Sequence, residues 1–168
     1  MQSFSCGYCA IKRNYNMIDW ENIKHFSKWE FSEDPDFHAE PQLIETLDAF
    51  REIVGKKIYP SREKGALARF EGTNPDSRHY AVGRKSDAID VFVEGDIRDN
   101  WMKAFCSKLW GGIGIYFDTH YKGHSWSMLH LDLRQGTTTY WYRVDKQYGH
   151  PILRSSDLHR MFGLLNAI

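Results

Sequence analysis

The alternation of apolar and polar positions predicts two strands that carry ionisable side chains on one face and aliphatic side chains on the other. In the segment 88–93, aliphatic residues alternate with Asp90. In the segment 126–133, leucines alternate with His130 and Asp132. Because successive side chains of a strand point to opposite faces, we expect each strand to bury its aliphatic face and to present the other.

Apolar residues at helical spacing predict four helices. They cover 17–29, 41–54, 96–110 and 156–165. The second is the clearest, because Pro41 suits a first turn and Gly55 suits a C-terminal cap. Gly111 and Gly112 are expected to end the third.

Three further strands are predicted, together with two loop segments. The strands cover 57–61, 113–118 and 138–144, and the loops cover 31–38, which is acidic, and 62–78. The last strand is expected to pair with the segment 126–133 across a turn at Gln135 and Gly136. The predicted order is helices first and then a series of strands, with the helix over 96–110 between two of the strands. This order is typical of the α+β class. We therefore expect a single domain over 1–168, with a mostly antiparallel central sheet flanked by helices.

Size and charge narrow the class of protein. A chain of 168 residues, 42% of them hydrophobic, is large enough to bury the core of one domain. Its 22 basic residues are balanced by 22 acidic ones, which argues against nucleic acid as an obligate partner. No apolar run approaches the roughly 20 residues that a membrane span needs. The segment 1–15 lacks the apolar run of an ordinary secretory signal, so none is expected.

The three cysteines, Cys6, Cys9 and Cys106, argue against a disulfide framework, which normally uses an even number. Cys6 and Cys9 form a lone CxxC, which suits a redox pair or half of a structural zinc site. No second CxxC and no βαβ pattern follow it. We therefore favour reduced thiols in a loop over either functional interpretation.

His79, Asp90 and His130 form a candidate metal site. Two imidazoles and a carboxylate leave one position of a tetrahedral zinc ion open, as a hydrolytic zinc site requires. Asp90 lies among the aliphatic residues of its strand, where an unpaired carboxylate would be costly. Its partner is expected to be either a metal ion or an arginine such as Arg84 or Arg134.

Other interpretations of the same residues stay open. A single histidine such as His130 is more often hydrogen-bonded than a metal ligand. The leucines on the opposite face of its strand, and the position of His79 just before the strand of Asp90, favour the ligand interpretation. Asp87 is the competing carboxylate, but it has the parity of the core-facing positions, so we favour Asp90.

Several motifs together resemble those of the zinc D-alanyl-D-alanine peptidases, a family of peptidoglycan carboxypeptidases and phage endopeptidases. The segment 77–91 resembles the family's SxHxxGxAxD metal motif. The segments 111–116 and 129–134 are similar to its GGIGxY and HxDxR motifs. The helix over 41–54 and the strand that leads to Arg62 are similar to its helix and SGYR start. The resemblance covers nearly the whole chain in order.

This resemblance implies a Hedgehog/DD-peptidase fold and one zinc ion held by His79, Asp90 and His130. It implies hydrolysis of peptide bonds in bacterial peptidoglycan, often next to D-alanine. Arg62 matches the motif arginine, so it is either a contact for a substrate carboxylate or an ordinary surface arginine.

The chain departs from the family pattern in two places. Ten residues separate His79 from Asp90, which is more than the motif has, although the cost of closing a loop grows slowly with its length. Better-known members also place an acidic general base two or three residues before the last histidine ligand, where this chain has Ser127 and Met128. Neither can take a proton from a bound water.

Three residues are candidates for the missing base. Asp132 shares the face of His130 and comes first; its alternative role is to orient a ligand histidine. Asp118 and His124 follow in that order. A base must lie within hydrogen-bond reach of the water, which the sequence does not show.

The expected function is that of a zinc metallopeptidase acting on peptidoglycan peptides of the bacterial cell wall. A phage lysis enzyme or a virion-associated enzyme, with phage virion proteins as partners, would fit such a chain. The alternative is a non-catalytic phage structural or wall-binding module that keeps the fold. A redox protein that uses Cys6 and Cys9 is a third, less favoured hypothesis. The aromatic residues at 140–142 and Trp126 are expected to pack the sheet rather than to stack on glycan.

Overall fold

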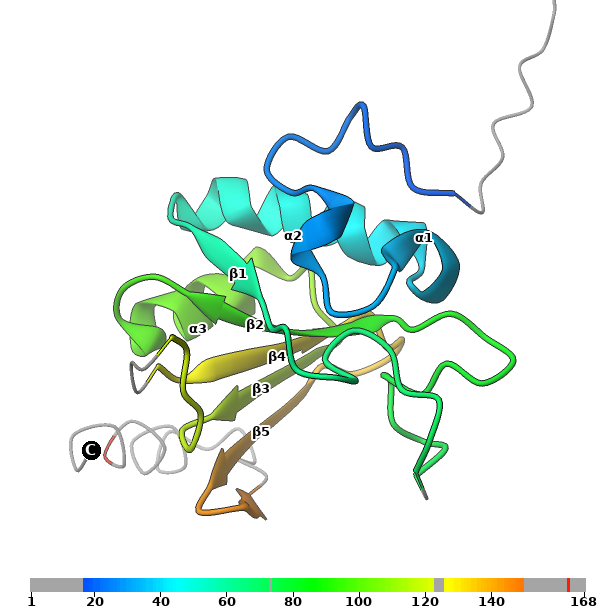
Figure 1. Cartoon of the computed structure of the whole chain (residues 1–168). Coiled ribbons are helices and arrows are strands. Elements are labelled where there is room, and N and C mark those ends of the chain that lie inside the picture. The colour runs from blue at the N-terminus through cyan, green and yellow to red at the C-terminus, as the bar shows by residue number, and fades with distance from the viewer. Residues whose placement is uncertain (1–16, 73, 123–125, 150–162, 164–168) are drawn as a thin grey trace, which may run out of the picture.

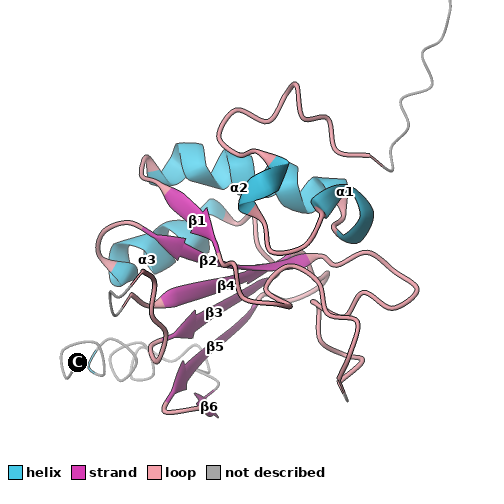
Figure 2. Cartoon of the chain, in the orientation of Figure 1, coloured by secondary structure: helices cyan, strands magenta, loops and turns pink. Residues whose placement is uncertain are grey.

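The computed structural model describes residues 17–72, 74–122, 126–149 and 163. Helices cover one face of a six-stranded sheet (Figures 1 and 2). The elements in chain order are a 3-10 helix η1 (Lys28–Glu30), α1 (Pro35–His38), α2 (Pro41–Val54), β1 (Ile58–Pro60), β2 (Ala88–Val93), α3 (Ile97–Ser107), β3 (Gly112–Tyr116), β4 (Met128–Asp132), β5 (Thr139–Val144) and β6 (Gln147–Gly149). The α+β class is thus confirmed.

The sheet is mixed, rather than the mostly antiparallel central sheet that was predicted, and its strand order is β1-β2-β4-β3-β5-β6. β3 and β5 run parallel, and the other neighbours run antiparallel. The predicted pairing of 138–144 with 126–133 is wrong. β4 already lies between β2 and β3, so both its edges are hydrogen-bonded and the returning chain adds to the free edge of β3. The pairing of β5 with β3 begins where Thr139 N donates to Gly111 O at 2.9 Å.

The two long helices form largely as predicted, because their ends carry suitable caps. α2 ends at Val54 and is capped by Gly55, whose φ of 66° is left-handed and whose N–H donates to Arg51 O. Asp96 caps the start of α3 by accepting from Arg98 N at 2.8 Å. α3 ends at Ser107, earlier than predicted, and Gly112 begins β3 instead of ending the helix.

The aliphatic faces of the central strands are buried under α2 and α3. The core there includes fully buried side chains from strands and helices alike: Leu43, Leu47, Phe50, Ile89, Val91, Trp101, Ile113, Leu129 and Leu131. The predicted assignment of faces in 88–93 and 126–133 is therefore confirmed. The opposite face carries a smaller cluster of Phe92, Tyr116, Met128 and Trp141.

The N-terminal part differs from the prediction. No α-helix forms over 17–29, where only η1 is helical. Instead, the Asp48 carboxylate on α2 accepts from Lys24 N at 3.2 Å and from His25 N at 2.8 Å, so these N–H groups are satisfied without a helix. The predicted loop 31–38 contains α1, which Asp34 caps from just before a proline.

Some predictions lie outside the described residues. These are the CxxC of Cys6 and Cys9 and all of the helix over 156–165 except Gly163, which is helical. Cys106 is a free, exposed cysteine. Among the described residues, every helix is too short or too polar to cross a bilayer.

Candidate metal centre

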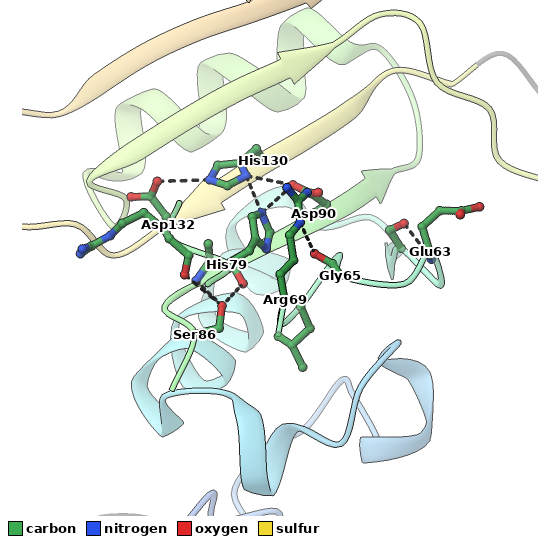
Figure 3. A network of polar contacts seen from close by, with 12 residues as sticks. Glu63, Gly65, Arg69, His79, Ser86, Asp90, His130 and Asp132 are labelled. Carbon is green, nitrogen blue, oxygen red and sulfur yellow. Dashed lines mark hydrogen bonds and ion pairs between the residues drawn. The ribbon is translucent and has the colours of Figure 1, made fainter. Parts of the chain in front are cut away.

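His79, Asp90 and His130 meet on the face of the sheet opposite the helices, and we call them the triad (Figure 3). His130 Nδ1 lies 2.9 Å from Asp90 Oδ1 and 2.9 Å from His79 Nε2, and His79 Nε2 lies 3.3 Å from Asp90 Oδ1. All three residues are buried, with exposed fractions of 3–4%. The structure thus brings together the residues that the sequence singled out.

Pairing of strands and loops places the triad. Asp90 on β2 and His130 on β4 are register partners, so their side chains share one face. His79 lies in the loop before β2, and its carbonyl accepts from Arg69 N at 2.7 Å. Asp90 N in turn donates to Ala66 O at 3.0 Å. The loop containing residues 66–69 therefore joins the backbone of His79 to that of β2.

The donor atoms of the triad fit a metal ion. Ligand atoms held 2.0–2.1 Å from a tetrahedral zinc lie about 3.4 Å apart, slightly more than the separations of 2.9–3.3 Å observed here. A neutral imidazole carries one N–H, so His130 Nδ1 cannot donate to both of its neighbours in the triad. A cation between the three atoms would satisfy all of them. The described side chains can therefore hold one metal ion.

The groups around the triad shift the pKa values of Asp90 and His130, and they keep the Asp90 carboxylate ionised. Burial raises the pKa of Asp90, but the charge of His79 and the hydrogen bond from His130 outweigh it and hold the pKa well below its usual range. Burial lowers the pKa of His130, but Asp132 and Asp90 outweigh it and raise the pKa. A carboxylate that stays ionised when buried is suited to bind a cation.

The arginine alternatives for Asp90 are not realised. Arg84 donates to two backbone carbonyls of its own loop, each at 2.7 Å. Arg134 pairs with a different carboxylate. Asp87, the competing candidate, pairs with Arg78 at 2.5 Å and does not join the triad.

A cavity of about 1070 Å³ opens onto the triad. Its wall includes arginines and aromatic rings: Arg69, Arg134, Arg143, Tyr116, Trp141 and Tyr148. His79, Asp90 and His130 all line this cavity, so a metal ion held by the triad would lie beside a space of the size of a ligand pocket.

Asp132, the first candidate for the general base, lies on the outer side of the His130 ring. Its Oδ2 is 3.2 Å from His130 Nε2, the nitrogen that points away from the triad. Asp132 is fully buried and does not line the cavity. Burial raises its pKa, but hydrogen bonds from His130 and Arg134 outweigh it and hold the pKa well below its usual range. This geometry agrees with the alternative role, in which Asp132 orients His130.

Asp118, the second candidate, does not meet the triad. The Asp118 carboxylate accepts from Arg143 Nε at 2.9 Å and from Lys146 N at 3.0 Å, and it does not line the cavity. His124 lies outside the described residues.

Arg62 is exposed and binds the protein backbone rather than lining the cavity. Its Nη1 donates to Trp29 O, and to Phe31 O at 3.4 Å. Arg69 lines the cavity instead, with its Nε donating to Gly65 O at 3.0 Å. Figure 3 shows its side chain extending from the loop toward Asp90. Sequence reasoning missed Arg69, because nothing in a loop-rich segment indicates which arginine turns inward.

Gly112 and Gly114, two glycines of the 111–116 motif, leave space for the Asp132 and Trp141 side chains beside His130. A Cβ at Gly112 would lie 2.3 Å from Asp132 Oδ2, and one at Gly114 would lie 2.4 Å from the Trp141 indole. The Trp141 ring lies 4.8 Å from the His130 ring between centroids. Both glycines were interpreted only as a helix end or as part of a motif, yet they make room for the two side chains that contact His130.

Comparisons of the chain with protein-family models, with curated proteins and with solved structures find no match.

Proposed function

We propose that the protein is a metal-dependent peptidase whose ion, zinc, is held by His79 Nε2, Asp90 Oδ1 and His130 Nδ1. The observation that carries this proposal is the buried triad at the floor of a large cavity. Two histidines and one carboxylate are a donor set of hydrolytic zinc enzymes. When bound, zinc lowers the pKa of a water molecule toward neutrality and polarises a carbonyl.

The residues around the triad support a peptide substrate that carries a carboxylate. Arg69 extends into the cavity, and its terminal guanidinium nitrogens can bind a carboxylate in the bidentate geometry that arginine favours. Tyr116 and Trp141 are buried beside His130 and make this wall of the cavity apolar. Together with the motif resemblance, these features favour the peptide part of bacterial peptidoglycan. A role in phage lysis or in a phage particle is part of this proposal.

A non-catalytic module that binds the cell wall, with zinc as a structural ion, is the second candidate. One observation favours it: both described carboxylates considered as general base, Asp132 and Asp118, are engaged by arginines. A hydrolase would then take its base from elsewhere in the cavity or from His124.

The test is mass spectrometry of soluble fragments released from purified peptidoglycan, with added zinc and with a chelator. We expect new peptide fragments that disappear with the chelator and with His130→Ala. His25→Ala is the matched control, because His25 pairs with Glu52 on α2, away from the cavity. Folded protein that releases no fragments from walls of several chemical types would overturn the peptidase proposal and favour the binding module.

A further inference from the structure

His130 differs from His79 in what its outer ring nitrogen contacts. The inner atoms, His130 Nδ1 and His79 Nε2, both face the triad. The outer nitrogen of His130, Nε2, faces Asp132 Oδ2 at 3.2 Å. The outer nitrogen of His79 is buried and has no hydrogen-bond partner among the described residues. Only one of the two rings is thus fixed from outside by a side chain in the described part of the chain.

Asp132 is itself held in place by Arg134. Arg134 N donates to Oδ1 at 3.0 Å, and Arg134 Nε lies 2.9 Å from both carboxylate oxygens. Arg134 Nη2 adds a further bond to Oδ2. On the other side, Gly112 leaves just enough space for the carboxylate, because a Cβ there would overlap it. Asp132 therefore cannot turn away from His130 without breaking several charged hydrogen bonds.

The guanidinium of Arg134 is fixed as well. It lies over the Trp141 ring, 5.1 Å from its centroid, and Trp141 also packs against His130. Arg134, Trp141, Asp132 and His130 thus form a closed ring of contacts. Such a closed arrangement defines the orientation of the imidazole more strictly than a single hydrogen bond would.

The contact with Asp132 determines which nitrogen of His130 can bind a metal. Both Asp90 and Asp132 can accept a hydrogen bond from His130, but a nitrogen that binds a cation carries no hydrogen. With a metal ion on Nδ1, the hydrogen of His130 therefore lies on Nε2, where the Asp132 carboxylate accepts it. The lone pair then lies on Nδ1 and points into the triad. A carboxylate that holds a ligand histidine in this way also makes the histidine a stronger donor to the metal.

We propose that Asp132 and Arg134 are positioning residues that fix His130 as an Nδ1 ligand, and that Arg134 acts through Asp132 rather than on the substrate. This inference rests on the metal centre of the proposed function but does not depend on peptide hydrolysis. Arg134 also lines the cavity, so it could bind substrate instead of holding Asp132, and the effect on metal affinity distinguishes these two roles. An arginine that only bound substrate would leave metal affinity in the absence of substrate unchanged.

Two measurements on the full chain test it without any substrate. The first is ¹⁵N NMR of the histidine rings in zinc-loaded protein, which should show His130 with zinc on Nδ1 and hydrogen on Nε2. The second is zinc affinity by competition with a chelating dye. We expect Asp132→Ala to weaken zinc binding about 10-fold to 100-fold. Asp132→Asn should lose less, because the amide oxygen can still accept from Nε2.

The arginine variants and a control complete the experiment. Arg134→Gln should weaken zinc binding, and Arg134→Lys should recover part of the loss. Asp118→Asn is the matched control, because it removes another arginine-bound carboxylate that does not contact the triad and should leave zinc affinity unchanged. Circular dichroism confirms that each variant is folded, and the arginine variants keep the test valid if Asp132→Ala fails to fold.

The outcomes distinguish this inference from the proposed function. Zinc bound through Nε2 of His130, or unchanged zinc affinity in folded Arg134→Gln and Asp132→Asn, would overturn the positioning role even if peptidoglycan is cleaved. Weakened zinc binding in the variants of a wild-type protein that cleaves nothing would support the positioning role and overturn the peptidase. A wild-type protein that binds no zinc would overturn both.

Discussion

Gly114 on β3 and Trp141 on β5 are register partners, and the indole of Trp141 fills the space that a side chain at Gly114 would occupy. A Cβ added at Gly114 would lie only 2.4 Å from Trp141 Nε1. Trp141 also packs against His130 on β4. The glycine at position 114 therefore helps to position His130, because it lets the Trp141 ring lie where it contacts this residue.

Gly114→Ala should therefore disturb both the sheet and the metal centre. The added methyl group must displace the Trp141 ring, and overpacking of this kind typically costs about 1–3 kcal/mol of unfolding free energy. We expect weaker zinc binding as well, since Trp141 would move relative to His130. Denaturant unfolding and a zinc competition assay measure the two effects.

Ile113→Val is the matched control for this variant. Ile113 is the preceding residue of β3 and points into the core on the opposite face. It should lose about 0.5–1.5 kcal/mol of stability and keep the zinc affinity of the wild type. Equal zinc affinities in all three proteins would show that Trp141 does not help to position His130.

Removal of the metal should lower stability, because the triad exists only in the folded chain. Zinc at 100 times its dissociation constant should add about 2.7 kcal/mol to the free energy of unfolding, and chelator should remove it. Thermal unfolding with and without zinc measures the shift. His79→Ala should unfold at the same temperature in both conditions. Magnesium, which prefers six oxygen ligands, should have little effect, and an equal shift with magnesium would argue against a zinc site.

Arg69 and Arg62 offer a direct comparison of substrate contact with structural contact. Arg69→Gln should weaken the hydrolysis of peptides with a free terminal carboxylate by about 10-fold or more, because a charge-assisted bidentate contact is lost. Arg62→Gln should leave hydrolysis nearly unchanged and affect stability instead, since Arg62 binds backbone carbonyls near Trp29. Steady-state kinetics on a peptide with a free terminal carboxylate and on its amide measure the two effects. A larger loss of hydrolysis in Arg62→Gln than in Arg69→Gln would contradict this assignment.

The side-chain faces of Asp90 and His130 could be predicted because strand parity is a local signal, whereas the register that makes the two residues neighbours is seen only in the structure. Strand parity placed Asp90 and His130 on one face, and register pairing then made them neighbours. The place of β5 could not be inferred in the same way. A turn between two strands is compatible with a hairpin, and only the full sheet shows that both edges of β4 are already bonded.

The roles of Arg69, Gly112 and the segment 17–29 depend on contacts between residues far apart in the chain. The apolar residues of 17–29 have helical spacing, but Asp48 binds two of its N–H groups and favours a loop. The sequence suggests that Gly112 ends a helix, whereas in the structure it leaves space for the Asp132 carboxylate. Local propensity could not reveal these contacts, because each is made by a tertiary partner.

Glu33 fixes the loop that carries Ala66 and Arg69, so its charge should matter for both stability and metal binding. Its carboxylate accepts from Gly65 N at 2.7 Å, Ala68 N at 3.1 Å and Leu67 N at 3.2 Å. Glu33→Gln should lose about 1–3 kcal/mol of stability, since an amide replaces a charged acceptor, and should weaken zinc binding.

Glu71→Gln is the control for the Glu33 variant. Glu71 forms an ion pair with Lys64 in which both side chains are 85% exposed. Its loss should change stability by less than about 0.5 kcal/mol. Equal stabilities of the two variants in urea unfolding would contradict the structural role of Glu33.

Asp118 should make the stability of the β3–β5 region depend on pH. Burial raises its pKa, but the hydrogen bond from Arg143 outweighs it, and the pKa lies below the usual value. A lowered pKa contributes stability above the pKa of the unfolded chain, and this contribution is lost as the pH falls through the folded value. Wild type should therefore exceed Asp118→Asn in unfolding free energy at pH 7, by about 1 kcal/mol for such an ion pair. The difference should shrink below the ordinary pKa of an aspartate, near 3.8. Urea unfolding of both proteins across this range measures it, and a difference independent of pH would show that the ionised Asp118–Arg143 pair is not its source.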